Sequence, residues 1–580
     1  MDKPALKHLL AAAAGREPAD LVIRNCRVVN VFTGEILPGE IAVAGEHIAG
    51  IGAPGEYRGQ TEYDAGGRFA APGLIDSHIH IESSFLSPAH LARLLVPHGT
   101  AVLVADPHEI TNVCGAAGID FMMRSAALTP LRVKFMLPSC VPATPFEHAG
   151  ADFTAADMAP LMPREEVLGL GEFMDYVSLT NGEDAALDKI LLAQRHGKRV
   201  DGHSVGLDGK ILNAYAAAGV CSDHECDTVE AMRERLRRGM YVMLRDGSAC
   251  HDLATLLKGV TPENARRCLF CVDDLQPRMV FRRGHLNHHL RTAVAAGIDA
   301  VTALRMATLN PAECYHLDDA GALAPGRRAD VTLFDDLREF TARAVWIGGK
   351  LCAENGRYLP EIRDADCRAV KASVHLAKFR EDDLRLHLSS PGVNVIEYTP
   401  GTIVTRKGTA TVKLTPDGDF QFDPAADIVK IAVIERHHDT GHVGLGLLKG
   451  YGIKHGAIAI TIAHDSHNII AAGVSNAEIA LAVKTLVQQE GGAVIVRDGK
   501  TIAAAPLPIA GLMAAQGGEA MTAELDALHD AAVDALGITN RVEPIMPLCF
   551  MALPVIPELK ITDMGLFDVT RFKFIPVERG

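Results

Sequence analysis

The sequence has no hydrophobic run that approaches the ~20 residues of a membrane span, and it has no excess of positive charge. Its 57 Lys and Arg residues are outnumbered by 72 Asp and Glu residues, which gives a formal net charge of −15. Such a chain is a poor general partner for nucleic acids or anionic membranes, and we expect neither. The apolar stretch within residues 1–15 is too short for a signal peptide and predicts an amphipathic helix. We therefore expect a cytoplasmic protein.

Cysteine follows no pattern typical of a disulfide scaffold or a zinc cluster. Twelve cysteines are spread over 580 residues, as in proteins of reducing compartments. The one Cys-x-x-Cys, Cys268 to Cys271, lies in an apolar run, where positions three apart face opposite sides of a strand. Without a second pair, packing is favoured over metal binding. The length and the 48% hydrophobic content predict about two to four domains with ample cores.

The order of apolar runs predicts three domains. Short alternating runs bounded by Gly and Pro predict β structure in residues 20–69 and again in 330–352. Between them, eight short apolar runs alternate with helical segments, which is the size and order of a (β/α)8 barrel. We predict an α/β protein with a composite β-sandwich domain (1–71 plus 321–365), a (β/α)8 catalytic barrel of the metal-dependent hydrolase type (72–320) and an α+β C-terminal domain (366–580). The expected barrel strands are Leu74–Ile81, Ala101–Ala105, Val133–Leu137, Val167–Phe173, Arg199–His203, Val220–His224, Tyr241–Leu244 and Leu269–Val272.

The C-terminal domain carries two unusual polar clusters, Glu435–Asp439 and His464–Asn468. They are either a hydrogen-bonded network internal to this domain or part of a lid that supplies polar groups to the barrel mouth. We expect the lid. The β-like runs expected around these clusters are Ile403–Val404, Val429–Val433, Ala457–Ile462 and Ala493–Val496, and the expected helices are Asn476–Gln489 and Met521–Leu536.

The first barrel strand carries the strongest chemical signal. Because side chains alternate faces along a strand, Asp76, His78, His80 and Glu82 share one face, and imidazoles two residues apart can reach one metal ion. The active site of such a barrel lies at the carboxyl ends of its strands. Polar residues that follow the later strands are Glu109, Glu172, His203, His224, Glu225, Arg245, Asp273 and Asp274. Each alone has an ordinary explanation, such as a helix cap, but their joint occurrence predicts a metal site.

These residues also carry a family resemblance. Pro72–His80 resembles the first-strand motif of the amidohydrolase superfamily. Motifs that resemble the adenine deaminase family within it are Ala105–Ile110, Leu168–Asp175, Ser222–Glu225, Val433–His438, Ala463–Asn468 and Leu507–Met513. The resemblance covers essentially the whole chain. It implies two divalent metal ions, Mn or Fe in the first place and Zn as an alternative. The implied ligands are His78, His80, His203, His224 and Asp273, with Glu172 bridging where many superfamily members use a carboxylated lysine.

The resemblance further implies hydrolytic deamination of adenine to hypoxanthine and ammonia, a purine-salvage reaction. Metal-bound hydroxide would attack C6 of the purine. Asp273 is placed to carry the hydroxide proton to the leaving amine, and Glu109, or more weakly Glu225, to protonate a ring nitrogen. Arg245 is a candidate to donate a hydrogen bond to a purine nitrogen, although a structural ion pair is an alternative role for it. The lid residues expected to contact substrate are His464, Asp465, His467 and Asn468.

Two other functions stay open at this point. One is hydrolysis of a cyclic amide, as in dihydroorotases or hydantoinases, which would keep the barrel and the metals. The other is a non-catalytic metal-binding barrel. A zinc nucleobase deaminase of the H-x-E and P-C-x-x-C type is excluded, because Cys268 follows Arg267 rather than a proline. Self-association to a homodimer is a further expectation.

Overall fold

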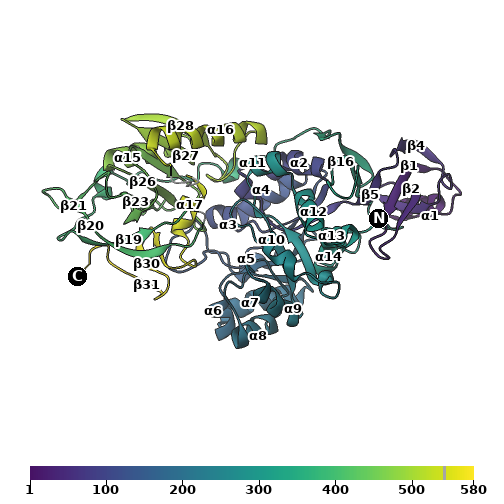
Figure 1. Cartoon of the computed structure of the whole chain (residues 1–580), viewed down its shortest axis with the longest axis horizontal. Helices are drawn as coiled ribbons and strands as arrows, with labels where there is room; N and C mark the ends of the chain where they lie inside the picture. Colours follow the sequence, from purple (N-terminus) through teal and green to yellow (C-terminus); the bar gives the residue numbers. More distant parts are fainter. Residues whose placement is uncertain (401, 540–543, 580) are drawn as a thin grey trace.

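The computed structural model describes residues 1–400, 402–539 and 544–579. It is elongated, with three parts in a row: a sheet-rich part that holds the N-terminus, a central barrel, and a C-terminal part built around a second large sheet (Figure 1). Among the described residues, no helix is both long and apolar enough to cross a membrane.

The first part is assembled from both ends of the barrel segment. Its nine strands form one sheet, and the two chain segments meet where β5 (Phe69–Pro72) pairs antiparallel with β15 (Val331–Phe334). Side chains of both segments share one hydrophobic cluster, so neither segment has a complete core alone. The expected N-terminal helix is present as α1 (Lys3–Ala13), which buries Leu9 and Ala12. The other strands are β1 (Ala19–Val29), β2 (Ile36–Ala44), β3 (His47–Gly52), β4 (Gly59–Asp64), β16 (Ala342–Ile347), β17 (Lys350–Glu354) and β18 (Arg357–Tyr358).

The barrel is closed by parallel pairing between its last and first strands. The eighth strand consists of β13 followed by the two-residue β14, and β14 pairs with β6. Parallel strands that are covered on both faces read as continuous apolar runs, and all six residues of β7 are buried. Each of the eight predicted barrel strands overlaps a strand of the structure. These strands are β6 (Leu74–His80), β7 (Thr100–Ala105), β8 (Arg132–Leu137), β9 (Val167–Phe173), β10 (Arg199–Gly202), β11 (Ser222–Asp223), β12 (Tyr241–Arg245), β13 (Cys268–Cys271) and β14 (Asp273–Asp274).

Helices cover the outside of the barrel (Figure 1). The sequence predicts helices at Ala185–His196 and Thr228–Arg238, and they are present as α7 (Asp184–Arg195) and α9 (Val229–Arg237). Thr228 caps α9 by accepting a hydrogen bond from the Ala231 amide. The other helices of at least eight residues in this part are α2 (Pro88–Leu95), α4 (Ala116–Ala126), α8 (Gly209–Ala217) and α12 (Leu286–Ala295).

The C-terminal part is an eight-stranded sheet packed against helix α15 (Asn476–Gln488) and helix α16 (Gly518–Ala531). The predicted strand at Ile403–Val404 is wrong. The chain becomes extended sheet only at Arg406, because Thr405 donates hydrogen bonds to the carbonyl oxygens of Pro557 and Leu559 instead of pairing within the sheet. The strands are β19 (Gly392–Glu397), β20 (Arg406–Thr411), β23 (Ile428–Ile434), β24 (Val443–Lys449), β25 (Ala457–Ile460), β26 (Ile469–Gly473), β27 (Gly492–Arg497) and β28 (Lys500–Pro506).

This part docks onto the carboxyl ends of the barrel strands. A single hydrophobic cluster contains residues of both parts, and the Ala514 amide donates to the Phe85 carbonyl across the contact at 2.8 Å. The connection from β25 to β26 contains His464–Asn468, and it faces the barrel mouth. The two parts therefore enclose the site between them.

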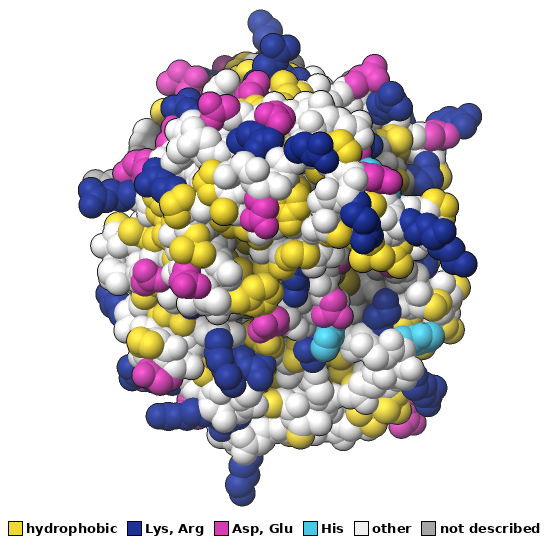
Figure 2. Space-filling view, turned by 90° about the vertical axis from the view of Figure 1, so that its right-hand side faces the viewer, with side chains coloured by type: hydrophobic (Ala, Val, Ile, Leu, Met, Phe, Trp, Pro, Cys, Tyr) yellow, Lys and Arg dark blue, Asp and Glu magenta, His cyan; other side chains and the backbone are white. Residues whose placement is uncertain are grey.

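Figure 2 views the end that carries the N-terminal sheet, where Lys and Arg side chains intermingle with Asp and Glu, and hydrophobic side chains lie in small groups between them. The exposed hydrophobic residues of this part include Leu6, Leu10, Phe32 and Leu37. No block of one charge sign dominates the visible face.

Candidate active site

Strand β6 brings two histidines together at the mouth of the barrel. His78 and His80 lie two residues apart on one strand face, as the sequence predicts, and both are buried. The Nε2 atoms of the two rings are 3.1 Å apart. His80 is oriented by its Nδ1 atom, which lies 3.0 Å from the Asp106 carbonyl oxygen. Both Nε2 atoms therefore point to the same place.

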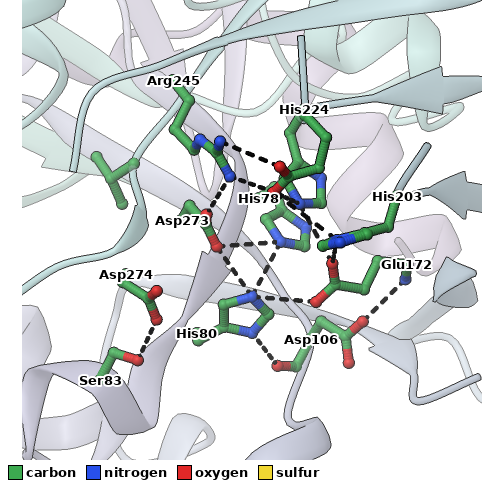
Figure 3. Close-up of polar contacts among 12 residues, drawn as sticks. His78, His80, Ser83, Asp106, Glu172, His203, His224, Arg245, Asp273 and Asp274 are labelled. Atoms are coloured by element: carbon green, nitrogen blue, oxygen red, sulfur yellow. Dashed lines mark hydrogen bonds and ion pairs between the residues drawn. The ribbon is translucent and has the colours of Figure 1, made fainter. Parts of the chain in front are cut away.

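Glu172, at the end of β9, stands between this pair and a second pair of histidines (Figure 3). Its Oε1 atom is 3.3 Å from His80 Nε2, and its Oε2 atom is 2.6 Å from His203 Nδ1 and 3.2 Å from His224 Nε2. Burial disfavours the charge on Glu172, but His203 and the other imidazoles outweigh burial and hold its pKa well below the usual range. The carboxylate thus has one oxygen toward each group of histidines.

Asp273 completes the set from the last strand. Its Oδ1 atom is 3.0 Å from His80 Nε2 and 3.6 Å from His78 Nε2. Its backbone has a φ of 61°, a left-handed conformation that residues other than glycine rarely adopt. Asp274 points elsewhere and accepts a hydrogen bond from Ser83 Oγ at 2.5 Å. The geometry therefore favours Asp273 over Asp274 as the carboxylate of this centre.

These six residues fit a centre for two metal ions. Their potential ligand atoms form overlapping groups, His78–His80–Glu172 and Glu172–His203–His224, and within each group the atoms lie within 4.8 Å of one another. Burial lowers the pKa of His80, yet Asp273 and Glu172 raise it well above the usual range, so the cluster attracts positive charge. Imidazole and carboxylate ligands without thiolate suit Mn, Fe or Zn. Glu172 belongs to both groups and could bridge two ions.

The centre lies at the base of a cavity of about 490 Å³. The barrel contributes its histidines and acids to one side. The opposite side is formed by the C-terminal part and is largely apolar. The apolar side chains that line it are Ile403, Val404, Phe550, Leu553, Val555, Ile556 and Pro557. A small planar ligand in this cavity would meet polar groups on one side and hydrophobic side chains on the other.

The comparisons with known proteins agree along the whole chain. Residues 69–352 match the model of the amidohydrolase family, and residues 402–573 match the adenine deaminase C-terminal domain. Adenine deaminase 2 of Desulfotalea psychrophila is 53% identical over 578 residues, which is 100% of both chains. This chain belongs to the adenine deaminase family. Adenine deaminases of Ligilactobacillus salivarius and Nitratidesulfovibrio vulgaris are 46% and 47% identical over 100% and 99% of both chains. The predicted family and fold class are confirmed.

The C-terminal loop of this family member reaches the cavity through two of the four predicted residues. His464 and Asp465 line it. The His464 ring stacks on Phe550, with centroids 4.4 Å apart and planes at 20°, and its Nδ1 atom is 3.4 Å from Glu109 Oε1. Asp465 Oδ1 is 3.8 Å from His108 Nε2.

The other two loop residues do not line the cavity. His467 is buried behind His464, and its Nδ1 atom accepts a hydrogen bond from the Ala463 amide. The Asn468 side chain donates to the His148 carbonyl oxygen at 2.8 Å and accepts from the Arg436 amide. We therefore revise their expected role from substrate contact to support of the loop.

The two candidate acids differ in charge. Burial, followed by the nearby Glu82 carboxylate, raises the pKa of Glu109 well above its usual range, and Ser83 Oγ lies 3.1 Å from its Oε1 atom. Glu225 is also buried, but the Arg245 and His203 charges outweigh that burial and lower its pKa. These surroundings thus favour the protonated form of Glu109 and the ionised form of Glu225.

Arg245 is fully engaged by acids. It donates to Glu225, to Asp252 at 3.0 Å and to Asp273 at 2.8 Å. Its guanidinium lines the cavity, but its donors already have partners. The contacts favour the ion-pair interpretation over a hydrogen bond to a purine nitrogen.

Three residues of the site were not predicted from the sequence. His108 lines the cavity, with its Nδ1 atom 3.3 Å from Glu172 Oε1, and Asp106 Oδ2 accepts the Glu172 amide at 3.0 Å. Both stand in the motif that follows the second strand, which was a usable signal. Asp201 lies 3.6 Å from His78 Nδ1, and its place two residues before His203 puts it on the same strand face.

Proposed function

We propose that this chain hydrolyses adenine to hypoxanthine and ammonia. The observation that carries the proposal is Glu172, which lies between two pairs of histidines, three of them buried and His203 partly exposed, at a cavity lined by both polar and apolar side chains. The full-length relatives named adenine deaminase support the choice of substrate.

The metal centre would be held by His78, His80, Glu172, His203, His224 and Asp273, and we propose Mn or Fe as its ions. Two divalent ions bound there would supply Lewis acidity, which brings the pKa of coordinated water from ~15.7 toward ~7. The N and O ligand set supports these metals and also tolerates Zn.

Asp273 would move one proton during the reaction. Burial opposes its ionisation, but hydrogen bonds from His78 and His80 and the Arg245 charge hold its pKa well below the usual range. As a carboxylate facing the centre it can accept the proton of the attacking hydroxide and deliver it to the amine as the bond from C6 to nitrogen breaks. Arg245, which donates to Asp273 Oδ2, fixes the orientation of this carboxylate.

Glu109 would protonate the ring nitrogen. It lines the cavity as a buried carboxyl whose raised pKa favours the protonated form, and it can make the adjacent carbon a better electrophile by giving its proton to the ring. That proton stays on hypoxanthine. The next water molecule to enter the site gives a proton to Glu109 as it becomes hydroxide, which restores the protonated carboxyl. Glu225, held ionised by Arg245, is a poorer donor.

The apolar wall would hold the base and keep bulk water away from the reacting carbon, as closed lids do. Its members Phe550, Leu553 and Ile556 come from the C-terminal part. We infer that this part completes the active site as well as covering it.

The deciding experiment is ammonia release with manganese-loaded and metal-stripped protein. We expect metal-dependent turnover of adenine and little turnover of adenosine or dihydroorotate. A protein that binds the metal and hydrolyses dihydroorotate but not adenine would replace this proposal with cyclic-amide hydrolysis. A protein that binds metal and turns over none of these substrates would refute the proposed reaction.

A further inference from the structure

A second group of possible metal ligands lies outside the catalytic cavity, on the contact between the barrel and the C-terminal part. It consists of His148, His442 and Asp563. His148 lies in the connection after β8, His442 directly precedes β24, and Asp563 lies in the turn between β29 (Leu559–Thr562) and β30 (Gly565–Asp568). None of the three lines the catalytic cavity.

The three side chains point their ligand atoms at one another. Asp563 Oδ2 is 2.5 Å from His148 Nδ1 and 3.9 Å from His442 Nδ1, and the two rings are 4.9 Å apart between centroids. The Asp563 side chain is fully buried, whereas those of His148 and His442 are 35% and 54% exposed. A buried carboxylate therefore lies beneath two imidazoles that solvent can reach.

We propose that His148, His442 and Asp563 form a third divalent-cation site, with the two-nitrogen, one-oxygen ligand set that suits Zn²⁺. Zinc binds His nitrogen and carboxylate oxygen at about 2.0–2.2 Å, and sites with three protein ligands leave one position for water. A small outward movement of the two exposed rings would admit an ion between them and Asp563. No charged side chain has to leave the buried interior.

A second His–Asp–His group in the barrel shows what distinguishes this one. There, His251 and His288 approach different oxygens of Asp246, and Arg283 adds a positive charge 3.9 Å away. At Asp563 both imidazoles approach the same oxygen. Among the described residues, Asp563 forms no ion pair with Lys or Arg. In the Asp563 group, both imidazoles thus face one carboxylate oxygen, and among the described residues no Lys or Arg side chain pairs with that carboxylate.

Occupancy of this site would fasten the loop over the cavity. Asn468, at the end of that loop, donates to the His148 carbonyl oxygen at 2.8 Å and lies 3.5 Å from Asp563 Oδ1. An ion held by His148, His442 and Asp563 would bridge three segments from both parts of the molecule. It should therefore raise the melting temperature of the holoenzyme.

The test is a metal count on holoenzyme dialysed against micromolar Zn²⁺. The matched variants are His442→Ala, which removes an exposed ligand, and His8→Ala, which removes another acid-paired histidine far from this contact. We expect wild type and His8→Ala to hold one metal equivalent more per chain than His442→Ala. The variant His442→Cys, which restores a zinc ligand, should regain that equivalent and the rise in melting temperature.

The same count can overturn the proposal. Equal metal content in wild type and His442→Ala would mean that no ion binds here and that His148 and Asp563 form a hydrogen bond only. Loss of the extra equivalent in His8→Ala as well would mean that it belongs to unspecific surface sites. Because the count does not depend on turnover, the result is independent of the proposed deaminase activity.

Discussion

Replacing Glu109 by glutamine tests the assignment of the ring-protonating acid. Glutamine has nearly the same shape as a protonated carboxyl and can still form a polar contact with Ser83 Oγ, but its amide cannot give up a proton. General acid catalysis contributes about 10²–10⁴-fold, which is roughly 3–5 kcal/mol at 1.36 kcal/mol per tenfold. We expect Glu109→Gln to lose this much in kcat on adenine, with KM and metal content nearly unchanged.

The pH profile adds a second readout. Burial raises the pKa of Glu109, so the folded enzyme keeps the active, protonated form above the pH at which a free glutamate ionises. Wild-type kcat should fall as the pH rises through this raised pKa, and Glu109→Gln should lack that fall. The matched variant Glu225→Gln removes the negative charge that pairs with Arg245 and should lower the melting temperature instead. A Glu109→Gln enzyme with more than about a tenth of wild-type kcat would refute the assignment.

Three further predictions concern the centre and its surroundings. Glu172→Gln should lose the binuclear metal content, since it replaces one of the two carboxylate oxygens that face the histidines by an NH2 group, which cannot bind a metal ion; a variant with two metals and full activity would contradict the bridging role. Arg245→Met should reduce the free energy of unfolding of metal-free protein by about 3–5 kcal/mol, because it leaves buried carboxylates without their partner; urea denaturation measures this. A loss below about 1 kcal/mol would mean that the Arg245 ion pairs contribute no more than exposed ones do. Burial lowers the pKa of Lys560 to about 7. Because the unfolded chain binds this proton up to about pH 10.4, stability should rise with pH between these values, and thermal melts of Lys560→Met should lack that rise.

The barrel was predictable because its signal is local. Strands buried on both faces must be apolar throughout, so β7 and β9 stand out as short apolar runs. A catalytic residue at the end of such a strand needs no tertiary information to be placed at the mouth. His78 and Glu172 were located in this way, and the structure brings them together with His80 between them.

The contacts between distant segments were not predictable in the same way. Asp252, which binds Arg245, follows no strand and carries no periodic signal. Ile403 has the hydrophobic character of a strand residue, yet it lines the cavity from an irregular segment, because its neighbour Thr405 is held by hydrogen bonds to residues 557 and 559. Which side of the C-terminal sheet faces the barrel depends on docking. This is why Asn468 could not be separated from His464 by sequence.

The docking also determines the chemistry of the site. Burial favours the protonated form of Glu109, and His464 of the C-terminal part lies 3.4 Å from this carboxyl. Burial and the positive charge of His108 lower the pKa of His464 to about 3, so this ring remains neutral and does not draw the proton from Glu109. A positively charged residue in place of His464 would favour ionisation of the Glu109 carboxyl, which would then have no proton to give. The C-terminal part thus helps to keep Glu109 in the form that can protonate a purine, in addition to closing the cavity above it.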